Sequence, residues 1–448
     1  MGKLFGTDGV RGIANVELTS DLAFKLGQAC AYVLAGEVNH VPNVLVGTDT
    51  RISCDMLESA LNAGLCSVGT NVIKVGVIPT PGVAYLTRKY KADAGVVISA
   101  SHNSFEFNGI KFFDSDGYKL PDEIEENIEE FILSEKKLPH KTGTEIGRIF
   151  KREELIDDYV DFLVSTVDID LTGMKIIIDC ANGAAYQVAK RVFDRLGVDT
   201  TVLFDSPDGI NINHHCGSTH IDQIISEIKK DSYDIGFAYD GDADRVMTVC
   251  ERGNLIDGDR MLGALAIFMK EKNLLSSHTI VATIMSNMGL EKLASDNQML
   301  LTRTKVGDRY VVEEMKKNNH QIGGEQSGHI ILNDYNTTGD GILTSLKLLS
   351  MLRDKKMKAS TMIELMIEYP QVTVNAKVKN HNKAKLFDNK KIMELYHQIE
   401  NQLSVEGRII LRPSGTEPIV RVMIEGKDIT DITEKANQLG KLIEKTLG

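Results

Sequence analysis

Residues 234–245 read DIGFAYDGDADR, an apolar run that passes directly into a loop of alternating aspartates. The run has the length and composition of a strand buried in a sheet. Asp240, Asp242 and Asp244 follow it, separated by small residues that let the backbone curl. Ligands of α/β proteins bind at the carboxyl ends of strands. The stretch therefore predicts an α/β fold with a functional loop at the end of a strand.

The same pattern, a strand-like run followed by a polar loop with glycine, occurs twice more. AGVVISASHN lies at residues 94–103 and HQIGGEQSGHI at residues 320–330. The pattern indicates three related α/β units whose loops face one shared cleft. After Tyr369–Pro370 the pattern changes, and a smaller, separate domain is expected. The predicted domains are residues 1–152, 153–254, 255–368 and 369–448. Amphipathic segments predict helices at residues 20–35, 122–133 and 430–446.

Composition and charge narrow the function classes. The chain has 448 residues, long enough for several domains, and a net charge of −12. This charge argues against nucleic acid or an anionic membrane as a partner. No apolar stretch approaches the ~20 residues that span a bilayer. Six scattered cysteines without a C-x-x-C pair indicate reduced thiols, and the N-terminus has no signal-peptide pattern, so we expect a cytoplasmic protein.

The loop DGDADR at residues 240–245 predicts a metal site. Three carboxylates at alternating positions offer all-oxygen ligation, which suits Mg²⁺. The simplest alternative is an acidic surface turn. A calcium EF-hand would place a glycine at the sixth loop position, where this chain has Arg245, although Glu251 stands at the twelfth. A loop that leaves a buried strand and closes with arginine favours Mg²⁺.

Residues 96–113 read VVISASHNSFEFNGIKFF and end a β-branched run in small polar residues. Ser101 is a candidate nucleophile activated by His102, or the segment is a strand followed by a turn. Adjacent residues of an extended chain point to opposite sides, and no G-x-S-x-G elbow is present. A serine beside a metal loop is better explained as a carrier of phosphate. Lys111 would act as a second cation, or as a proton donor if burial depresses its pKa.

Three further motifs hold candidate binding residues. RPSGTEP, at residues 412–418, resembles a phosphate cradle, because a turn with hydroxyls and a nearby arginine can hold an anion; a Pro/Gly turn between strands is the alternative. GEQSGH, at residues 324–329, suits hydrogen bonds to sugar hydroxyls or forms a simple polar turn. FGTDGVRG, at residues 5–12, presents Arg11 either as a phosphate clamp or as the partner of a structural carboxylate.

With these five motifs in this order, the chain resembles the α-D-phosphohexomutase superfamily over essentially its whole length. The resemblance is closest to the bacterial branch that acts on glucosamine phosphates, on the wording FGTDGVRG, ISASHN and GGEQSGH. Two positions depart from the family pattern. Ser104 stands where proline is usual, and Phe107 where an acidic residue is frequent. We expect these changes to alter loop rigidity at most, although Ser104 adds a second hydroxyl near Ser101.

The resemblance implies three related α/β domains with mixed sheets and a C-terminal α+β domain like the TATA-binding protein, around a central cleft. It implies the interconversion of glucosamine 6-phosphate and glucosamine 1-phosphate, which supplies UDP-N-acetylglucosamine synthesis. A glucosamine 1,6-bisphosphate would serve as intermediate or primer, and a homodimer and an activating kinase are further expectations. The alternatives are a phosphomannomutase/phosphoglucomutase, a Mg²⁺-dependent sugar phosphatase, and a sugar-phosphate sensor without catalysis.

The resemblance also assigns roles, motif by motif. Ser101 matches the serine that carries phosphate, and its phosphate joins Asp240, Asp242 and Asp244 as a ligand of Mg²⁺. The basic positions around the reacting phosphate are Arg11, His102, Lys111 and Arg245. Among them, Lys111 is expected to transfer protons. The residues matched to substrate binding are Glu325 and Ser327 for the sugar and Arg412, Ser414, Gly415, Thr416 and Arg421 for the distal phosphate. KVGDRYV, at residues 305–311, matches a further substrate-facing loop.

Overall fold

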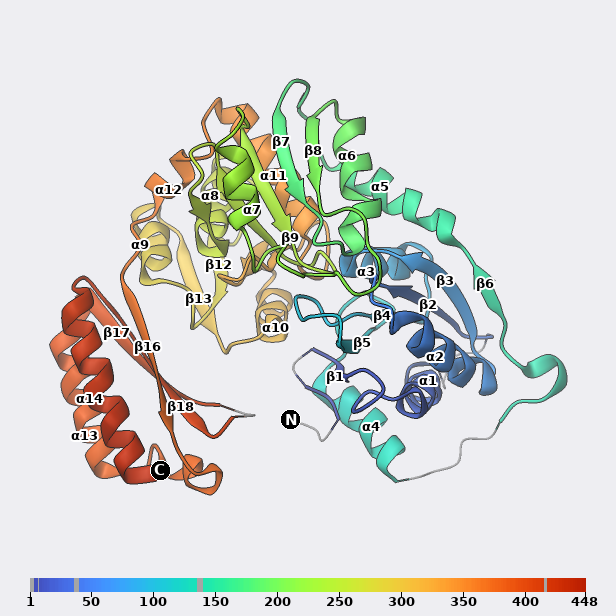
Figure 1. Ribbon diagram of the computed structural model, residues 1–448, viewed down its shortest axis with the longest axis horizontal. Helices are drawn as coiled ribbons and strands as arrows, with labels where there is room; N and C mark the ends of the chain where they lie inside the picture. Colours follow the sequence, from blue (N-terminus) through green and yellow to red (C-terminus); the bar gives the residue numbers. More distant parts are fainter. Residues whose placement is uncertain (1–3, 7, 36–39, 135–139, 415–416) are drawn as a thin grey trace. The chain divides into compact units, whose positions relative to one another are not determined.

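The computed structural model describes residues 4–6, 8–35, 40–134, 140–414 and 417–448 (Figure 1). The chain divides into two compact units. The larger comprises Met1–Ser286 and Ala294–Leu365, and the smaller comprises Asn287–Leu293 and Met366–Gly448. Each unit has its own sheets, and each is described by itself.

The first sheet of the larger unit has six strands in the order β1-β5-β4-β2-β3-β6. The strands are β1 (Val10–Ile13), β2 (Asn43–Thr48), β3 (Asn71–Val77), β4 (Ala94–Ile98), β5 (Phe107–Phe113) and β6 (Ile149–Lys151). The helices are α1 (Ser20–Ala35), α2 (Cys54–Ser67), α3 (Thr80–Lys89) and α4 (Asp122–Leu133). Every residue of β4 is buried, as expected for a strand covered by helices on both faces.

The second and third sheets are smaller. The order is β11-β10-β9-β7-β8 in the second and β13-β12-β14-β15 in the third. The strands are β7 (Lys175–Asp179), β8 (Asp199–Leu203), β9 (Ile235–Tyr239), β10 (Val246–Cys250), β11 (Leu255–Ile256), β12 (Thr279–Thr283), β13 (Leu300–Thr304), β14 (Ile322–Gly324) and β15 (Ile330–Leu332). The helices are α5 (Ile156–Ser165), α6 (Ala189–Arg195), α7 (Asp222–Ile228), α8 (Gly258–Glu271), α10 (Asp308–Asn318), α11 (Gly341–Lys355) and α12 (Thr361–Leu365). Helix α9 (Met288–Asp296) lies mostly in the segment Asn287–Leu293 that belongs to the smaller unit.

The three sheets share one topology. In each, a central strand (β2, β7 or β12) lies parallel to both of its neighbours. One neighbour (β4, β9 or β14) then turns back into an antiparallel strand (β5, β10 or β15). The three motif loops are the connections of these antiparallel pairs. The prediction of three related α/β units with mixed sheets is confirmed. The units resemble one another in strand order, although their sequences share little identity.

The smaller unit is an α+β domain (Figure 1). Its antiparallel sheet has the order β16-β18-β17, with β16 (Gln371–Lys377), β17 (Gly407–Pro413) and β18 (Ile419–Gly426). Two helices, α13 (Lys390–Leu403) and α14 (Ile429–Leu447), pack their apolar residues against the sheet in one buried cluster. The C-terminal α+β fold is confirmed, whereas the domain boundaries proposed from the sequence stay predictions.

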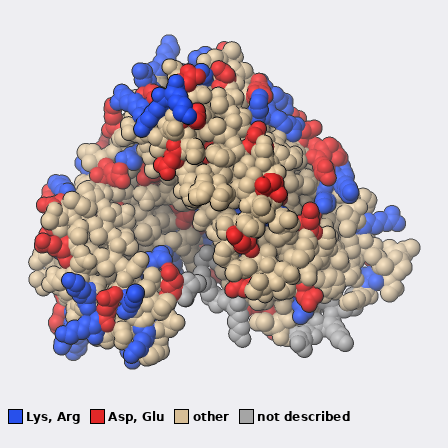
Figure 2. Space-filling view, viewed as in Figure 1, with Lys and Arg blue, Asp and Glu red and all other residues tan. Residues whose placement is uncertain are grey.

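Charged side chains of both signs are interspersed on the face of the molecule drawn in Figure 2. None of the helices that the structure describes is long and apolar enough to cross a membrane.

Candidate active site

The loops that follow β4 and β9 meet inside the larger unit. Ser101 follows β4 and is fully buried. Its Oγ donates a hydrogen bond of 2.5 Å to Oδ2 of Asp240, which follows β9 and lies 139 residues away in the sequence. The fold therefore brings together the two motifs that the sequence analysis placed in one site.

The acidic loop has the donors that a small divalent cation needs. One oxygen each of Asp240, Asp242 and Asp244 lies within 4.8 Å of the others, and all three residues are buried. Asp242 Oδ1 and Asp244 Oδ1 have no hydrogen-bond partner among the described residues. Burial raises the pKa of Asp240, and the charges of Asp244 and Asp242 raise it further. Three crowded carboxylates with two orphan oxygens fit a hard cation such as Mg²⁺.

Lys111 lies against the same carboxylates from strand β5. Its Nζ is 2.8 Å from Asp242 Oδ2, 3.4 Å from Asp244 Oδ2 and 3.2 Å from Asp8 Oδ2. Burial acts to lower the pKa of Lys111, but Asp242, Asp8 and Asp244 outweigh it, so the pKa is raised. The condition set from the sequence, a pKa depressed by burial, is therefore not met, because three carboxylates surround the amine.

A chain of ion pairs continues from Lys111 into the third α/β region. Asp8 pairs with Lys111 and with Lys119, and Lys119 also pairs with Asp308 at the start of α10. Asp308 Oδ2 lies 3.4 Å from Nε2 of His329, whose Nδ1 lies 3.6 Å from Asp244 Oδ1. The GEQSGH and KVGDRYV motifs thus connect to the metal loop through buried charges.

Basic residues also lie close to Ser101, and Arg245 lies 3.9 Å from both Asp240 Oδ2 and Asp244 Oδ1. Arg245 Nη1 donates to Ser101 Oγ at 3.3 Å and also contacts His102 Nδ1. Burial lowers the pKa of His102 to about 4, aided by the charges of Arg245 and Arg11, so the imidazole is neutral near pH 7. Its Nδ1 is 3.5 Å from Ser101 Oγ, too long for an effective base. Arg11 pairs with Asp8, the structural carboxylate that the sequence left as one alternative.

The position of Ser104 explains why the second hydroxyl is not equivalent to the first. Ser104 is exposed, whereas Ser101 is fully buried. Ser104 supplies its backbone carbonyl to Arg51, and its side chain interacts with Glu106. Phe107 is 36% exposed at the start of β5 and has no role in the contacts of Ser101.

Three buried polar residues that the sequence analysis missed hold the Ser101 loop. Arg51 and Asn213 donate to the Ser101 carbonyl at 2.9 and 2.8 Å, and Asp49 accepts from Arg51 Nε at 2.9 Å. Asp49 and Arg51 directly follow strand β2. A strand-like run followed by charged residues, TDTR at 48–51, was the available signal; Asn213 offered none.

Gly241 permits the close approach of the two loops. A Cβ at this position would lie 2.6 Å from the Ser101 carbonyl oxygen and 2.9 Å from Asn213 Nδ2. No side chain fits there without moving backbone. The glycine in DGDADR is thus required by packing against the serine loop.

The motif GEQSGH, predicted to bind the sugar, forms a tight turn between β14 and β15. Ser327 Oγ donates to Glu325 Oε2 at 3.4 Å, so the two predicted sugar-binding side chains lie together on a partly exposed turn. Gln326, between these two residues, points elsewhere. Its Nε2 donates to Asp257 Oδ2 at 3.2 Å, the carboxylate that caps α8. Gln326 therefore supports the turn through a helix cap.

The predicted phosphate loop belongs to the smaller unit. Arg412 on β17 and Arg421 on β18 stand directly opposite each other in register, where like charges repel. Arg421 Nη2 pairs with Glu417 Oε2 at 2.8 Å, which offsets part of this repulsion. Burial lowers the pKa of Arg412, and the charge of Arg421 adds to this. Ser414 Oγ accepts from the backbone of Glu417 at 3.1 Å, and Lys383, unforeseen from the sequence, donates to the Ser414 carbonyl at 2.7 Å. Gly415 and Thr416 lie outside the described residues.

Comparison with family models and curated proteins decides the family. Models of the phosphoglucomutase/phosphomannomutase family match in chain order: alpha/beta/alpha domain I at residues 2–139, domain II at 157–253, domain III at 257–369 and the C-terminal domain at 374–439. A phosphoglucosamine mutase of Acetivibrio thermocellus is 55% identical over 449 residues, covering 100% of both chains. One of Ruminiclostridium cellulolyticum is 54% identical over 448 residues, again covering 100% of both. The chain belongs to the phosphoglucomutase/phosphomannomutase family.

Solved structures show the same fold. A phosphoglucomutase/phosphomannomutase family protein of Burkholderia thailandensis matches with a TM-score of 0.83 at 24% identity, covering 100% of this chain and 99% of that one. An N-acetylphosphoglucosamine mutase of Aspergillus fumigatus, in complex with GlcNAc-6P and magnesium, matches with a TM-score of 0.71 at 16% identity, covering 100% and 96%. At these identities the likeness concerns the fold of the phosphoglucomutase/phosphomannomutase family.

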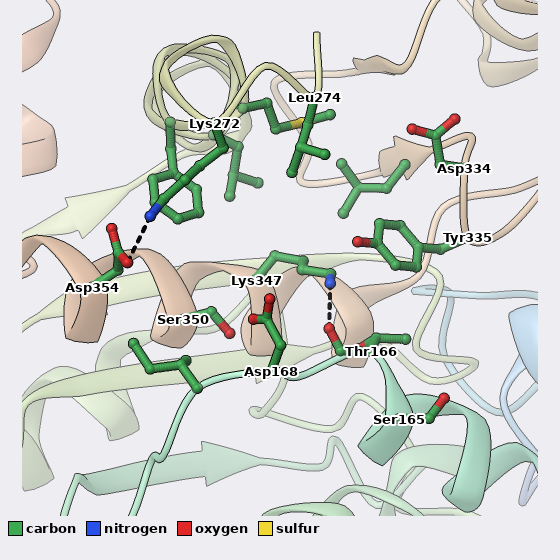
Figure 3. Close-up of a pocket in the computed structure, with 15 residues that line it drawn as sticks. Ser165, Thr166, Asp168, Lys272, Leu274, Asp334, Tyr335, Lys347, Ser350 and Asp354 are labelled. Carbon is green, nitrogen blue, oxygen red and sulfur yellow. Dashed lines mark hydrogen bonds and ion pairs between the residues drawn. The ribbon is translucent and has the colours of Figure 1, made fainter.

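This family member also has a cavity of about 520 Å³ away from the acidic triad (Figure 3). Its walls come from the end of α5, from α8 and from α11, and it includes none of the site residues predicted from the sequence. Lys347 donates to the Thr166 carbonyl at 2.5 Å, and Lys272 pairs with Asp354 at 2.7 Å. The amines in this cavity therefore bond to its own walls, unlike the orphan oxygens of the triad.

Proposed function

We propose that this chain interconverts glucosamine 6-phosphate and glucosamine 1-phosphate through a phosphorylated Ser101. The observation that carries the proposal is the buried Ser101 hydroxyl, 2.5 Å from a carboxylate of the acidic triad. Curated relatives at 52–55% identity over 99–100% of the chain are named phosphoglucosamine mutase, which supports this substrate over mannose or glucose phosphates. The product would supply UDP-N-acetylglucosamine synthesis.

The reaction would use two phosphoryl transfers. In the first, a free sugar hydroxyl attacks the phosphorus on Ser101, the bond from phosphorus to Ser101 Oγ breaks, and a sugar 1,6-bisphosphate forms. After this intermediate turns around, Ser101 Oγ attacks its other phosphate, and the isomeric monophosphate leaves. Mg²⁺ held by Asp240, Asp242 and Asp244 would neutralise charge on the phosphoryl oxygens.

The other residues would take the roles that their motifs predict. Arg245 contacts Ser101 Oγ and would hold phosphoryl oxygens, with Arg11 and neutral His102 nearby. The resemblance assigns proton transfer to Lys111, but its raised pKa among carboxylates favours the alternative role, a second cation beside the reacting phosphoryl group. The proton of the attacking hydroxyl would pass to the leaving oxygen of the same transfer. Glu325 and Ser327 would bind the sugar hydroxyls. The distal phosphate would be held by Arg412, Ser414, Gly415, Thr416 and Arg421.

The sequence-based expectations of a cytoplasmic location, a homodimer, a priming kinase and a bisphosphate primer stay predictions that accompany this proposal. They do not affect the chemistry at Ser101.

Intact-mass analysis and a coupled turnover assay test the proposal together. We expect one phosphate on the peptide that contains Ser101 and conversion of glucosamine 6-phosphate into glucosamine 1-phosphate after priming by a bisphosphate. Ser101→Ala should lose both properties, and Ser104→Ala, the matched control, should keep them. Wild-type activity in Ser101→Ala refutes the mechanism. Higher kcat/KM with mannose or glucose phosphate refutes the substrate, and release of inorganic phosphate without isomer indicates a phosphatase.

A further inference from the structure

Two side chains hold the same pair of backbone carbonyls in the Ser101 loop. Arg51 Nη2 donates to Ser101 O at 2.9 Å and to Asn103 O at 2.8 Å. Asn213 Nδ2 donates to the same two oxygens at 2.8 and 2.9 Å. Arg51 is 2% exposed and Asn213 is 7% exposed, so these bonds are shielded from water.

The loop needs such support because of its backbone conformation. Ser101 has a φ of 52°, in the left-handed region that residues other than glycine seldom occupy. Such a conformation persists only where its surroundings enforce it, and functional sites are where it is found. In this conformation Ser101 Oγ points at Asp240 Oδ2.

All three nitrogens of the Arg51 guanidinium donate hydrogen bonds to Asp49 or to carbonyls of the loop. Its Nε donates to Asp49 at 2.9 Å, and its Nη1 donates to Phe107 O at 3.1 Å and to Ser104 O. Asp49 also accepts from Ser99 Oγ at 2.6 Å, and that hydroxyl accepts from the Ser101 amide at 3.0 Å. The guanidinium therefore serves the loop backbone and not the substrate.

The two clamping residues come from different sheets. Arg51 follows β2 of the first sheet. Asn213 belongs to a loop of the second α/β region, where its own amide donates to the Ala181 carbonyl at 2.9 Å. Asp240 ends β9 of that same second sheet. The serine is thus tied to the sheet that carries the aspartates as well as to its own.

We propose that Arg51 and Asn213 are positioning residues that clamp the Ser101 and Asn103 carbonyls and so keep Ser101 Oγ at the triad in both transfers. This rests on the proposed function, because Ser101 must act first as leaving group and then as nucleophile from one place. A displacement of about 1 Å can slow such chemistry by roughly 10²-fold. The clamp touches neither the sugar loop nor the distal phosphate loop, so it should change kcat and leave KM nearly constant.

Asn213→Asp is the sharpest variant, because it keeps the shape of the side chain and removes its N–H donors. Aspartate also tolerates the positive φ of 57° at this position. Asn211→Asp is the matched control: it lies in the same loop, but its Nδ2 donates to Ser206 O, at 3.0 Å. Arg51→Lys keeps the charge and loses the planar fork that reaches several carbonyls.

The experiment measures kcat, KM, the magnesium-dependent melting shift and hydrogen exchange of peptides covering residues 99–104. For Asn213→Asp and Arg51→Lys we expect kcat to fall about 10²-fold, KM to stay within about threefold, and exchange to rise. Asn211→Asp should match the wild type in all four. If Arg51→Lys does not fold, Asn213→Asp decides alone.

A folded Asn213→Asp protein with wild-type kcat or wild-type exchange overturns the clamp, as does a rise in KM alone. If the wild type shows no transfer through Ser101, the proposed function fails. In that case, hydrogen exchange at residues 99–104 in the variants and the wild type still tests whether Arg51 and Asn213 hold the loop, because exchange does not depend on turnover.

Discussion

Replacing one aspartate of the triad should change stability in opposite directions with and without magnesium. The variant is Asp240→Asn, which keeps an oxygen that can accept from Ser101 Oγ. Asp240, Asp242 and Asp244 place carboxylate oxygens within 4.8 Å of one another in a buried site. At an effective dielectric constant of about 20, two unit charges at this distance repel by roughly 3.5 kcal/mol.

The net effect follows from three pairs of charges. Neutralising Asp240 removes two repulsions, about 7 kcal/mol together, and one attraction to Arg245, which at the 3.9 Å separation is worth about 4 kcal/mol. Burial, together with the same repulsion from Asp244 and Asp242, raises the pKa of Asp240. We therefore expect a gain of about 1–3 kcal/mol for the variant without metal.

Magnesium should reverse this order. A ligand at about 1,000 times its Kd stabilises the folded state by about 4.1 kcal/mol, which exceeds the expected advantage of the variant without metal. The wild type should gain this stabilisation, and Asp240→Asn should lose most of it, since it lacks one charged ligand. The assay is melting of both proteins in chelator and in excess Mg²⁺, with Asp388→Asn, an exposed aspartate, as the control. A wild-type Mg²⁺ shift in Asp240→Asn refutes the metal assignment, and a lower melting temperature in chelator refutes the repulsion argument.

Three further predictions address the loops around the triad. Gly241→Ala should lower kcat by about 10²-fold with little change in KM, because its Cβ would lie 2.6 Å from the Ser101 carbonyl oxygen; unchanged kcat would show that the loops can separate freely. Arg421→Ala should raise the KM for sugar phosphates by about tenfold, with exposed Lys441→Ala as control, and an unchanged KM would remove Arg421 from phosphate binding. Burial raises the pKa of Asp179 from 3.8 to about 7, so its stabilisation is present below about pH 4 and is lost as the pH rises towards 7. Between pH 5 and 7, the free energy of unfolding of Asp179→Asn should fall less steeply with pH than that of the wild type, by about 1.4 kcal/mol per pH unit. Equal slopes in the two proteins would contradict the raised pKa.

Local patterns in the sequence predicted the elements and the loops well. The amphipathic segments at residues 20–35 and 122–133 form α1 and α4 with the same bounds. The apolar run before Asp240 is strand β9, and its loop meets the Ser101 loop because both follow strands of sheets with one topology. Periodicity and strand-end loops are local signals, so they survive without knowledge of the fold.

Long-range polar contacts could not be predicted in this way. Asn213 reaches Ser101 across 112 residues, and nothing in its neighbourhood distinguishes it from Asn211. The direction of the pKa shift of Lys111, which decides between its two proposed roles, could not be predicted for a related reason. This direction depends on whether burial or nearby carboxylates dominate, and the decisive neighbours, Asp8 and Asp242, both lie more than a hundred residues away in the sequence. Composition and spacing carry no information on such a balance.

The balance of charge at the triad explains why metal and phosphoserine belong together. Asp240, Asp242 and Asp244 contribute three negative charges, and Lys111 and Arg245 contribute two positive charges, while His102 is neutral. A phosphate on Ser101 would add about two negative charges, leaving roughly three in excess in a buried site. A divalent cation offsets most of that excess. Phosphorylation of Ser101 should therefore tighten Mg²⁺ binding, and by linkage Mg²⁺ should stabilise the phosphoserine to the same extent. Equal Mg²⁺ affinities for the phosphorylated and unmodified proteins, measured by calorimetry, would contradict this reasoning.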